Sequence, residues 1–352
     1  MNTELQQKLD AATILLARLD GMAYTLPNTD LFITMYLKKE ALLSSQIEGT
    51  QASLQDVFEF EKDKDYSNIN NVEEVANYIR ALNYGIKKLK TFPMSIRLLK
   101  ELHSILLKNV RGKKKTPGDF KKSQNWIGPA GCTLQDATFV PPPPEEAKKA
   151  ISDLEKFIYK KATLPELINC ALIHYQFETI HPFLDGNGRL GRLLITFYLC
   201  WKGVLQNPLL YLSHYFKKHR QEYYDRLNMV RNKGDYEQWI SFFLDGIIEV
   251  SKSAIDNTKK ILSLHENIKQ KLFENKISSP LAIIFLDKLF YTPIISTKDL
   301  QTKLDISYQS AANLILTFEE LEILKEVSGK KRDKKFSFFK YIEILSEGTK
   351  PL

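Results

Sequence analysis

The sequence predicts a mostly α-helical protein that carries one β-hairpin and a small mixed unit near its C-terminal end. Apolar residues recur at a spacing close to 3.6 over most of the chain, which is typical of amphipathic helices. Strand patterns are assigned only to residues 123–140 and to a pair of strands around residues 329–335. The composition, 43% apolar and 26% charged over 352 residues, is ordinary for a globular protein with several domains.

The first part of the chain is predicted to form two helices. Apolar side chains recur at helical spacing from Leu5 to Leu15 and again from Leu31 to Ile47, with Pro27 between the two runs. The second run is followed by Gly49, a residue type that commonly follows the end of a helix. We therefore expect a helix over about residues 30–49.

A polar loop at residues 61–70 precedes two further helices, predicted from Val72 to Leu89 and from Ser95 to Leu107. His103 in the second of them has no second ligand at the i+4 position, so it is interpreted as a buried, hydrogen-bonded side chain. The loop at residues 108–122 contains seven Lys or Arg and one Asp, and is interpreted as a solvated basic surface.

A β-hairpin is predicted at residues 123–140, because Trp126–Gly128 and Thr138–Val140 flank a Pro-Ala-Gly turn. The four prolines at residues 141–144 then form a stiff extended connector. A helix is expected after them, up to Tyr159.

The stretch from His181 to Arg192 reads His-Pro-Phe-Leu-Asp-Gly-Asn-Gly-Arg-Leu-Gly-Arg. Gly186 and Gly188 lack a Cβ atom, so the backbone can bend there and bring its N–H groups against an anion. A helix is predicted from about Arg189, which places the bend at a helix N-terminus with positive partial charge. The stretch is therefore predicted to be a phosphate site.

The charged side chains of this stretch indicate a nucleoside triphosphate bound with magnesium. Arg189 and Arg192 stand three residues apart on one face of the first helical turn, where each guanidinium can grip phosphate oxygens. Asp185 offers a hard oxygen ligand, and Mg²⁺ commonly takes one or two carboxylates together with substrate phosphates. His181 is a candidate base.

Two other interpretations fit this stretch less well. Residues 186–191 also satisfy the dinucleotide pattern G-x-G-x-x-G, but the segment before them has helical spacing and residues 206–213 contain no Asp or Glu. The dinucleotide interpretation is therefore rejected. A plain helix-capping loop would leave His181, Asp185 and both arginines without a role.

The same stretch resembles the Fic motif, H-P-F-x-[D/E]-G-N-G-R-x-x-R, at every specified position. This resemblance implies a Fic-fold helical core and the transfer of AMP from ATP to a protein hydroxyl. The roles that it implies are general base for His181, Mg²⁺ ligand for Asp185, contact with the α- and β-phosphates for Asn187 and the amides of Gly186 and Gly188, contact with the β-phosphate for Arg189, contact with the γ-phosphate for Arg192, and a core anchor for Phe183.

The segment Ser44-Ser-Gln-Ile-Glu48-Gly49 resembles the inhibitory signature of the same family, [S/T]-x-x-x-E-[G/N]. Ser44 and Glu48 are four residues apart and share one helix face. A carboxylate near a helix C-terminus is disfavoured by the helix dipole, which indicates a purpose elsewhere. In the family this Glu pairs with the second arginine of the motif, here Arg192, and obstructs the γ-phosphate, so Glu48 is counted with the ATP site.

The hairpin resembles the Fic flap, which lies beside the active site and docks the target segment by β-augmentation. This resemblance places an unknown target protein on residues 123–140 and puts Ile127 and Gly128 among the ATP-binding residues. Tyr223 and Tyr224 are assigned to adenine or ribose contact, because related Fic proteins place Tyr and Asn residues at this point.

The last part of the chain resembles a winged helix-turn-helix domain. Helices are predicted at Leu281–Leu289, Thr297–Leu304 and Ser307–Leu321, followed by the two strands around residues 329–335. Residues 278–352 contain 11 Lys or Arg and 10 Asp or Glu, so the formal charge is only +1. We expect this domain to bind a partner protein or to assemble the enzyme, and DNA binding is left open.

Composition limits the cellular setting. The N-terminus lacks the apolar region of a signal peptide and the longest apolar run is too short to span a bilayer, which predicts a cytoplasmic protein without a membrane partner. The three cysteines are widely spaced and predict neither a disulfide framework nor a zinc site. The expected regions are an N-terminal helical region at 1–110, a Fic core at 111–250, a helical connector at 251–277 and the winged helix-like domain at 278–352.

The sequence thus predicts a protein adenylyltransferase that uses Mg-ATP on a Ser, Thr or Tyr of a target or of itself, and that is autoinhibited by Glu48. Two alternatives remain open. A de-AMPylase would use the same site, because a carboxylate beside it can position water. A DNA-binding regulator would only sense nucleotide in its Fic core, and the complete His181 and Arg192 set argues against it. The target and the oligomeric state, a homodimer included, stay open.

Overall fold

The computed structural model describes residues 2–23, 29–60, 69–129, 131–161, 163–329 and 332–351. Several sequence-based expectations fall outside these ranges. They are the helix separator Pro27, most of the polar loop at 61–70, Ala130 of the hairpin turn, and residues 330–331 between the last two strands.

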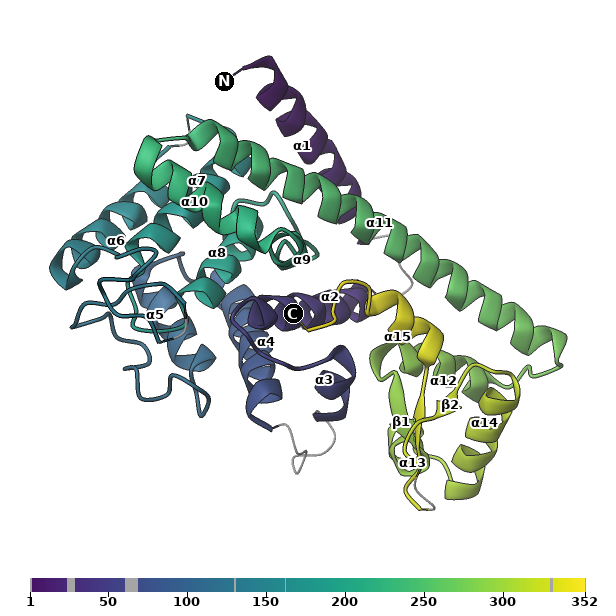
Figure 1. The fold of residues 1–352 in the computed structure, drawn as a ribbon. Helices are drawn as coiled ribbons and strands as arrows, with labels where there is room; N and C mark the ends of the chain where they lie inside the picture. Colours follow the sequence, from purple (N-terminus) through teal and green to yellow (C-terminus); the bar gives the residue numbers. More distant parts are fainter. Residues whose placement is uncertain are drawn as a thin grey trace.

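The protein is mostly helical, as the sequence predicts (Figure 1). The helices before the central loop are α1 (Thr3–Ala23), α2 (Thr29–Ile47), α3 (Leu54–Phe60), α4 (Ile69–Leu89), α5 (Ile96–Leu106) and α6 (Pro144–Tyr159). Their ends follow local chemistry. Ser95 caps α5 by accepting a hydrogen bond from the N–H of Leu98, and Gly49, just beyond α2, has a φ of +94°, a value that favours glycine.

The centre of the molecule is formed by α7 (Glu166–Ile180) and α8 (Asn187–Trp201), which pack against each other. Nearly every side chain of both helices is buried. A helix that is apolar all round belongs in a core. The short loop between α7 and α8 is therefore held at both ends by core helices, and it contains the first half of the stretch from His181 to Arg192.

The remaining helices of this part are α9 (Ser213–Lys218), α10 (Arg220–Lys233) and α11 (Tyr236–Glu274). α11 is 39 residues long and runs from the helical core to the C-terminal unit, with α1 packed along it (Figure 1). The expected boundary between residues 250 and 251 thus lies inside one continuous helix. No helix within the described ranges, α11 included, has the length and apolar character needed to cross a membrane.

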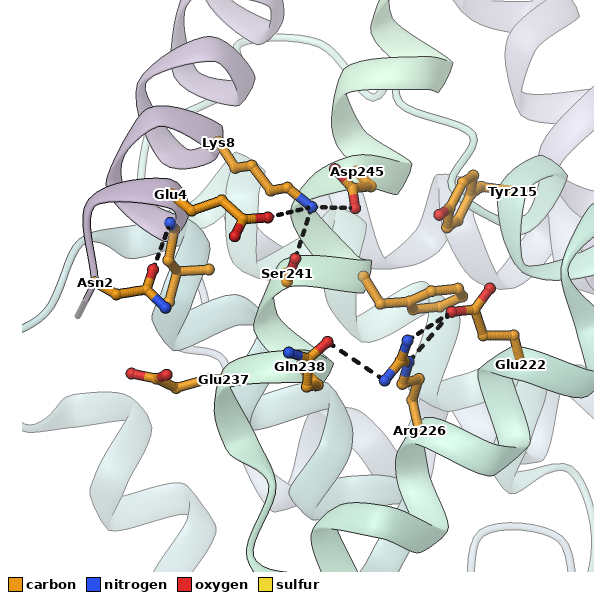
Figure 2. A pocket seen from close by; sticks show the side chains of 12 residues that line it. Asn2, Glu4, Lys8, Tyr215, Glu222, Arg226, Glu237, Gln238, Ser241 and Asp245 are labelled. Atoms are coloured by element: carbon orange, nitrogen blue, oxygen red, sulfur yellow. Dashed lines mark hydrogen bonds and ion pairs between the residues drawn. The ribbon is translucent and has the colours of Figure 1, made fainter.

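A polar cavity of about 280 Å³ lies where α1 meets α10 and α11 (Figure 2). Most of its charged groups are paired with each other: Lys8 Nζ lies 2.7 Å from Asp245 Oδ2, and Arg226 donates hydrogen bonds to Glu222. The cavity contains no residue of the 181–192 stretch. We interpret it as the polar junction that fixes α1 against the core.

The C-terminal unit combines short strands with four helices. Its elements are α12 (Pro280–Tyr291), β1 (Ile294–Ser296), α13 (Thr297–Leu304), α14 (Tyr308–Glu320), β2 (Lys325–Glu326), β3 (Lys335–Ser337) and α15 (Phe339–Leu345). The strands form an antiparallel sheet in the order β1-β3-β2, with Ile294 opposite Ser337. The three predicted helices are confirmed. β1 and α15 were not predicted. In β1 the reason is that Ile294 and Ile295 are both buried and show no alternation.

Candidate active site

The loop between α7 and α8 turns through two left-handed residues. His181 ends α7 with φ 48° and ψ 60°, and Gly186 precedes α8 with φ 77°. A left-handed conformation is sparsely populated by residues with a Cβ, so the surrounding structure must hold His181 in place. Glycine adopts it at no steric cost. The backbone thereby reverses direction and presents the N-terminus of α8 to the site.

The loop is closed by the side chain of Asn187. Its Oδ1 accepts a hydrogen bond from the N–H of Phe183 at 2.9 Å, and its Nδ2 donates to the carbonyl of the same residue at 2.8 Å. Asn187 is 1% exposed. Its amide therefore shapes the loop, and the predicted contact of Asn187 with phosphate stays a prediction. Phe183 is fully buried, which confirms it as the core anchor.

His103 on α5 holds the loop through two hydrogen bonds. Its Nδ1 accepts a hydrogen bond from the N–H of Gly118 and its Nε2 donates to the carbonyl of Asp185, each at 2.8 Å. The imidazole also stacks on Phe183 with ring centroids 3.8 Å apart. Burial lowers the pKa of His103 to about 4, so the ring is neutral at pH 7, as this bonding pattern requires. The interpretation of His103 as a buried, hydrogen-bonded side chain is confirmed.

We predict that His103→Ala destabilises the protein by about 1–3 kcal/mol, because the partly buried N–H of Gly118 and carbonyl of Asp185 lose their partner. AMP transfer should fall as well, since the loop carries the catalytic groups. Urea denaturation of the two proteins measures the difference. The control is His219→Ala, at a partly exposed histidine outside the loop. Equal midpoints for His103→Ala and wild type would show that these two hydrogen bonds contribute nothing.

A carboxylate lies over the N-terminus of α8. The first N–H groups of a helix have no partner inside it and attract anions. Gly188 is in this first turn, and a Cβ added there would overlap the carboxylate of Glu48. The absence of a side chain at residue 188 is thus what lets Glu48, from the end of α2, approach the anion-binding end of α8.

Arg192 binds the last turn of α2. Its Nε donates to Ser44 Oγ at 2.8 Å, and its Nη2 donates to the Ser44 carbonyl at 2.9 Å and to Glu48 Oε1 at 2.7 Å. Burial raises the pKa of Glu48. The charge and hydrogen bond of Arg192, together with the charges of Arg189 and His181, outweigh burial, so the pKa lies below its ordinary value. Both groups are therefore charged at pH 7. The predicted pairing of Ser44 and Glu48 with Arg192 is confirmed as geometry.

Arg189 faces a second acidic group. Its guanidinium lies 3.7 Å from Glu74 on α4 and 3.7 Å from Asp185, while its Nε and Nη1 have no hydrogen-bond partner although they are buried. A buried donor without a partner is costly, so these atoms indicate space for an acceptor. Arg111 reaches the same region, donating to the carbonyl of Glu48 at 3.0 Å and lying 3.6 Å from Glu74.

The basic loop is only in part the solvated surface that the sequence suggested. Arg111 holds the backbone beside Glu48, and Lys121 is 3% exposed and donates to Asn125 Oδ1. The spacing of charges in a run cannot reveal which of them turn inward. Glu74 was missed for a related reason, since it occupies one position among several polar residues of an amphipathic helix.

The site fits a metal that is held chiefly by substrate. The described residues contain no group of three or more His, Cys, Asp or Glu side chains able to hold a metal ion, so a complete protein cage is not built there. Asp185 is about one third exposed. Its Oδ1 accepts from the N–H of Gly186 at 2.6 Å, and a Cβ at Gly112 would overlap its Oδ2, so glycine leaves this oxygen open. One carboxylate plus phosphates suits Mg²⁺.

His181 is neutral in this environment. Burial lowers its pKa to about 4, with Lys121 acting in the same direction and Glu48 in the opposite one. A neutral imidazole carries one protonated nitrogen and one free lone pair, so it can accept a proton.

The hairpin lies beside His181. Ile127 and Phe139 exchange both backbone hydrogen bonds, at 2.8 and 3.0 Å, so the predicted hairpin is present as a single bridge. Gly128 follows the bridge. Arg231 of α10 lies over the Phe139 ring at 3.6 Å and also donates to the carbonyl of Glu178, one turn before His181. Arg231 thus joins the hairpin to the end of α7, a role that sequence reasoning did not find.

Tyr223 and Tyr224 lie at different depths. Tyr223 is 1% exposed, and its hydroxyl donates to His174, whose other nitrogen donates to the carbonyl of Gly191. It therefore supports α8 from inside the core, and its predicted contact with the nucleotide stays a prediction. Tyr224 is only partly buried, and Cζ of Arg220 lies 5.5 Å from the centre of its ring. Burial, and after it the nearby carboxylate of Glu48, raises the pKa of Tyr224 to about 12.

Comparisons with known proteins concern the family and the fold. The model of the "Fic/DOC family N-terminal" region matches residues 6–87, and the model of the "Fic/DOC family" matches residues 93–199. Among solved structures, a Fic family protein from Desulfovibrio desulfuricans G20 is similar over 96% of both chains, with a TM-score of 0.62 and 18% identity. A Fic domain containing signaling protein from Bacteroides thetaiotaomicron covers 73% of this chain, with a TM-score of 0.55 and 19% identity.

Curated relatives share part of the sequence. The Protein adenylyltransferase Fic of Drosophila yakuba is 28% identical over 219 residues, which cover 59% of this chain and 41% of that protein. The protein of the same name from Aedes aegypti is 34% identical over 130 residues, covering 36% of this chain and 23% of that protein. The chain thus spans less than half the length of these relatives.

Proposed function

The chain belongs to the Fic/DOC family, and from this premise we propose that it is a protein adenylyltransferase, which transfers AMP from Mg-ATP to a Ser, Thr or Tyr hydroxyl. The observation that carries the proposal is the carboxylate of Glu48 over the N-terminus of α8, paired with Arg192 at 2.7 Å. It is an anion of this chain at a place built for anions, between a helix N-terminus and two buried arginines.

In this proposal the polyphosphate of ATP binds where α8 begins. The backbone N–H groups of Gly188 and Asn187 bind phosphate oxygens, and Arg189 uses the donors that are unpaired in the free protein. Asp185 is the protein ligand of Mg²⁺, which supplies charge neutralisation of the phosphates when bound. Arg192 binds the γ-phosphate once Glu48 has left it.

His181 acts as the general base. It takes the proton of the target hydroxyl while the hydroxyl oxygen forms a bond to the α-phosphorus, and the bond from that phosphorus to the pyrophosphate oxygen breaks. The products are an AMP ester of the target and pyrophosphate. The neutral state of the ring supports this role.

The target segment is proposed to bind the hairpin at residues 123–140. Among the described residues of the hairpin, the strand bridge joins Ile127 and Phe139, and an added strand would use neighbouring backbone groups. Trp126 and Val140, 43% and 45% exposed, offer apolar contact beside that edge. Arg231 would keep the added strand at a fixed distance from His181.

We predict that the pH dependence of AMP transfer by Glu48→Gly is flat between about pH 8 and pH 6. An ordinary histidine, with a pKa near 6.5, would lose roughly three quarters of its base form in that range. The pKa of His181 is about 4, and removing Glu48 takes away an influence that raises it, so the base stays unprotonated. Lys121 lowers the pKa, so Lys121→Met should move the acid limb to higher pH. A half-maximal rate near pH 6.5 in Glu48→Gly itself would contradict this assignment.

A second candidate is removal of AMP by hydrolysis at the same site. It is favoured by the position of Glu48, whose side chain is 32% exposed beside His181 and can hold a water molecule. The two functions respond oppositely to Glu48→Gly. Transfer should rise in that variant, whereas hydrolysis that depends on the carboxylate should be lost.

The proposal is tested by incubating the Glu48→Gly chain with a cell lysate and ATP labelled at the α-phosphorus. We expect labelled target proteins, with labelling that disappears when EDTA removes Mg²⁺ and weakens in Asp185→Ala. Labelling that is insensitive to EDTA, or no labelling at any ATP concentration, would overturn the proposed reaction.

A further inference from the structure

The inhibitory helix α2 is enclosed on all sides. Every residue from Met35 to Ile47 is buried, whereas a helix at the surface of a core exposes one face. One side of α2 faces α4, α8 and α9, and another faces α12 of the C-terminal unit. Figure 1 shows α2 between the helical core and the C-terminal unit, with α15 and the chain end beside it.

The tail after α15, residues 346–351, binds the last turn of α2 through Gln46. The Nε2 of this fully buried side chain donates to the carbonyl of Thr349 at 2.8 Å and to that of Ala52 at 2.8 Å. Its Oε1 accepts from Lys217 Nζ at 2.7 Å. Gln46 stands between Ser44 and Glu48, the two residues that bind Arg192.

Lys217 depends on the same tail. Besides Gln46, its ammonium donates to the carbonyls of Gly348, at 3.2 Å, and Lys350. Burial lowers the pKa of Lys217 to about 8, and all three of these hydrogen-bond acceptors are neutral. The tail therefore supplies two of the three acceptors of a buried cation, which otherwise would have to be solvated.

The tail also packs closely against α9. Thr349 is 4% exposed, and its hydroxyl donates to the carbonyl of Ser346. Gly348 has a φ of +75°, and a Cβ there would overlap the ring of His214 on α9. A side chain at residue 348 is thus incompatible with the docked tail.

We propose that the tail is a latch that holds the end of α2, and with it Glu48, in the inhibitory position. The proposal rests on the proposed function, in which Glu48 blocks the γ-phosphate. Displacing the tail takes the Thr349 carbonyl from Gln46 and two carbonyls from Lys217, loosens the turn that bears Glu48 and frees Arg192. An event at the C-terminal unit that moves α15 is thereby coupled to AMP transfer.

Two substitutions in the full chain test the latch. Gly348→Val expels the tail by collision with His214, and Lys217→Met removes the ammonium while keeping the bulk of the side chain. The matched control is Lys218→Met, at the neighbouring exposed lysine that pairs with Glu249. In an otherwise wild-type chain, each latch variant should raise AMP transfer at least about fivefold, the lower end of ordinary coupling between two sites. Neither should add to the activity of Glu48→Gly.

Hydrogen exchange provides a readout that does not need the reaction. Amides of residues 44–50 should exchange faster in both latch variants than in wild type and Lys218→Met. Unchanged exchange in both variants, or unchanged transfer while Glu48→Gly is active, would overturn the latch. Faster exchange with an inactive Glu48→Gly would support the latch and would instead refute the proposed function of the site.

Discussion

Replacement of His181 by alanine is expected to reduce AMP transfer by about 10²–10⁴-fold, the ordinary contribution of a positioned general base. The variant should be made in the Glu48→Gly chain, where activity is highest and a loss is easiest to measure. The reason is local: the imidazole is neutral, and no other described side chain of the site is assigned to accept the proton. Initial rates with labelled ATP provide the measurement.

Two controls separate loss of the base from loss of the fold. ATP binding should remain, because the contacts assigned to the phosphates come from residues of α8, Arg189 among them. The thermal midpoint should also be retained, since His181 is only partly buried. His219→Ala provides a matched histidine control that should keep full activity. A His181→Ala chain with the rate of its parent would show that the base is another group.

Glu48→Gly is expected to raise AMP transfer roughly 10- to 100-fold over wild type. The charge-assisted hydrogen bond from Arg192 to Glu48 holds the guanidinium away from the γ-phosphate, and such bonds contribute about 1.5–3 kcal/mol. Every 1.4 kcal/mol corresponds to a factor of about ten in population. Gly188 would then be open to a phosphate in place of the carboxylate.

The gain must depend on Arg192. In the double variant Glu48→Gly with Arg192→Ala, activity should fall back toward the wild-type level, because the freed guanidinium is the source of the increase. Glu59→Gly, at a carboxylate on α3 that pairs with Gln55, serves as the control for a general effect of losing a Glu. An equal rise with and without Arg192 would show that Glu48 inhibits by another route.

Local chemistry explains why much of this fold is predictable from the sequence. The helices carry their own periodicity and end at residues such as Gly49 and Gly234, which adopt left-handed conformations after α2 and α10. The hairpin is marked by its turn residues. The sheet of the C-terminal unit is harder to predict, since β1 has only three residues and two of them are buried.

The site divides in the same way. The stretch from His181 to Arg192 and the segment from Ser44 to Glu48 are each continuous in sequence and each resembles a family motif. The pairing of Arg192 with Ser44 and Glu48 could therefore be predicted from the two resemblances. Glu74 and Arg231 act through contacts between distant helices, which periodicity does not reveal. Asn187 and Tyr223 show a further limit: their residue types do not reveal that their side chains bond to buried backbone and ring atoms.

The latch contact also lies beyond sequence reasoning. Gln46 and Thr349 are 303 residues apart and belong to no shared motif. Lys217 resembles its neighbour Lys218 in sequence, yet the first is buried with three oxygen partners and the second is exposed. Only the packing of α2 between two parts of the chain distinguishes them.

The most direct test of the account compares the fate of two phosphorus atoms of ATP. The purified Glu48→Gly chain and a lysate are incubated in parallel with ATP labelled at the α-phosphorus or at the γ-phosphorus, and protein-bound label is counted. Transfer of AMP predicts label on protein from the α-position and none from the γ-position, with the α-label lost in the His181→Ala derivative. Protein-bound label from the γ-position, or α-label that persists without His181, would contradict it.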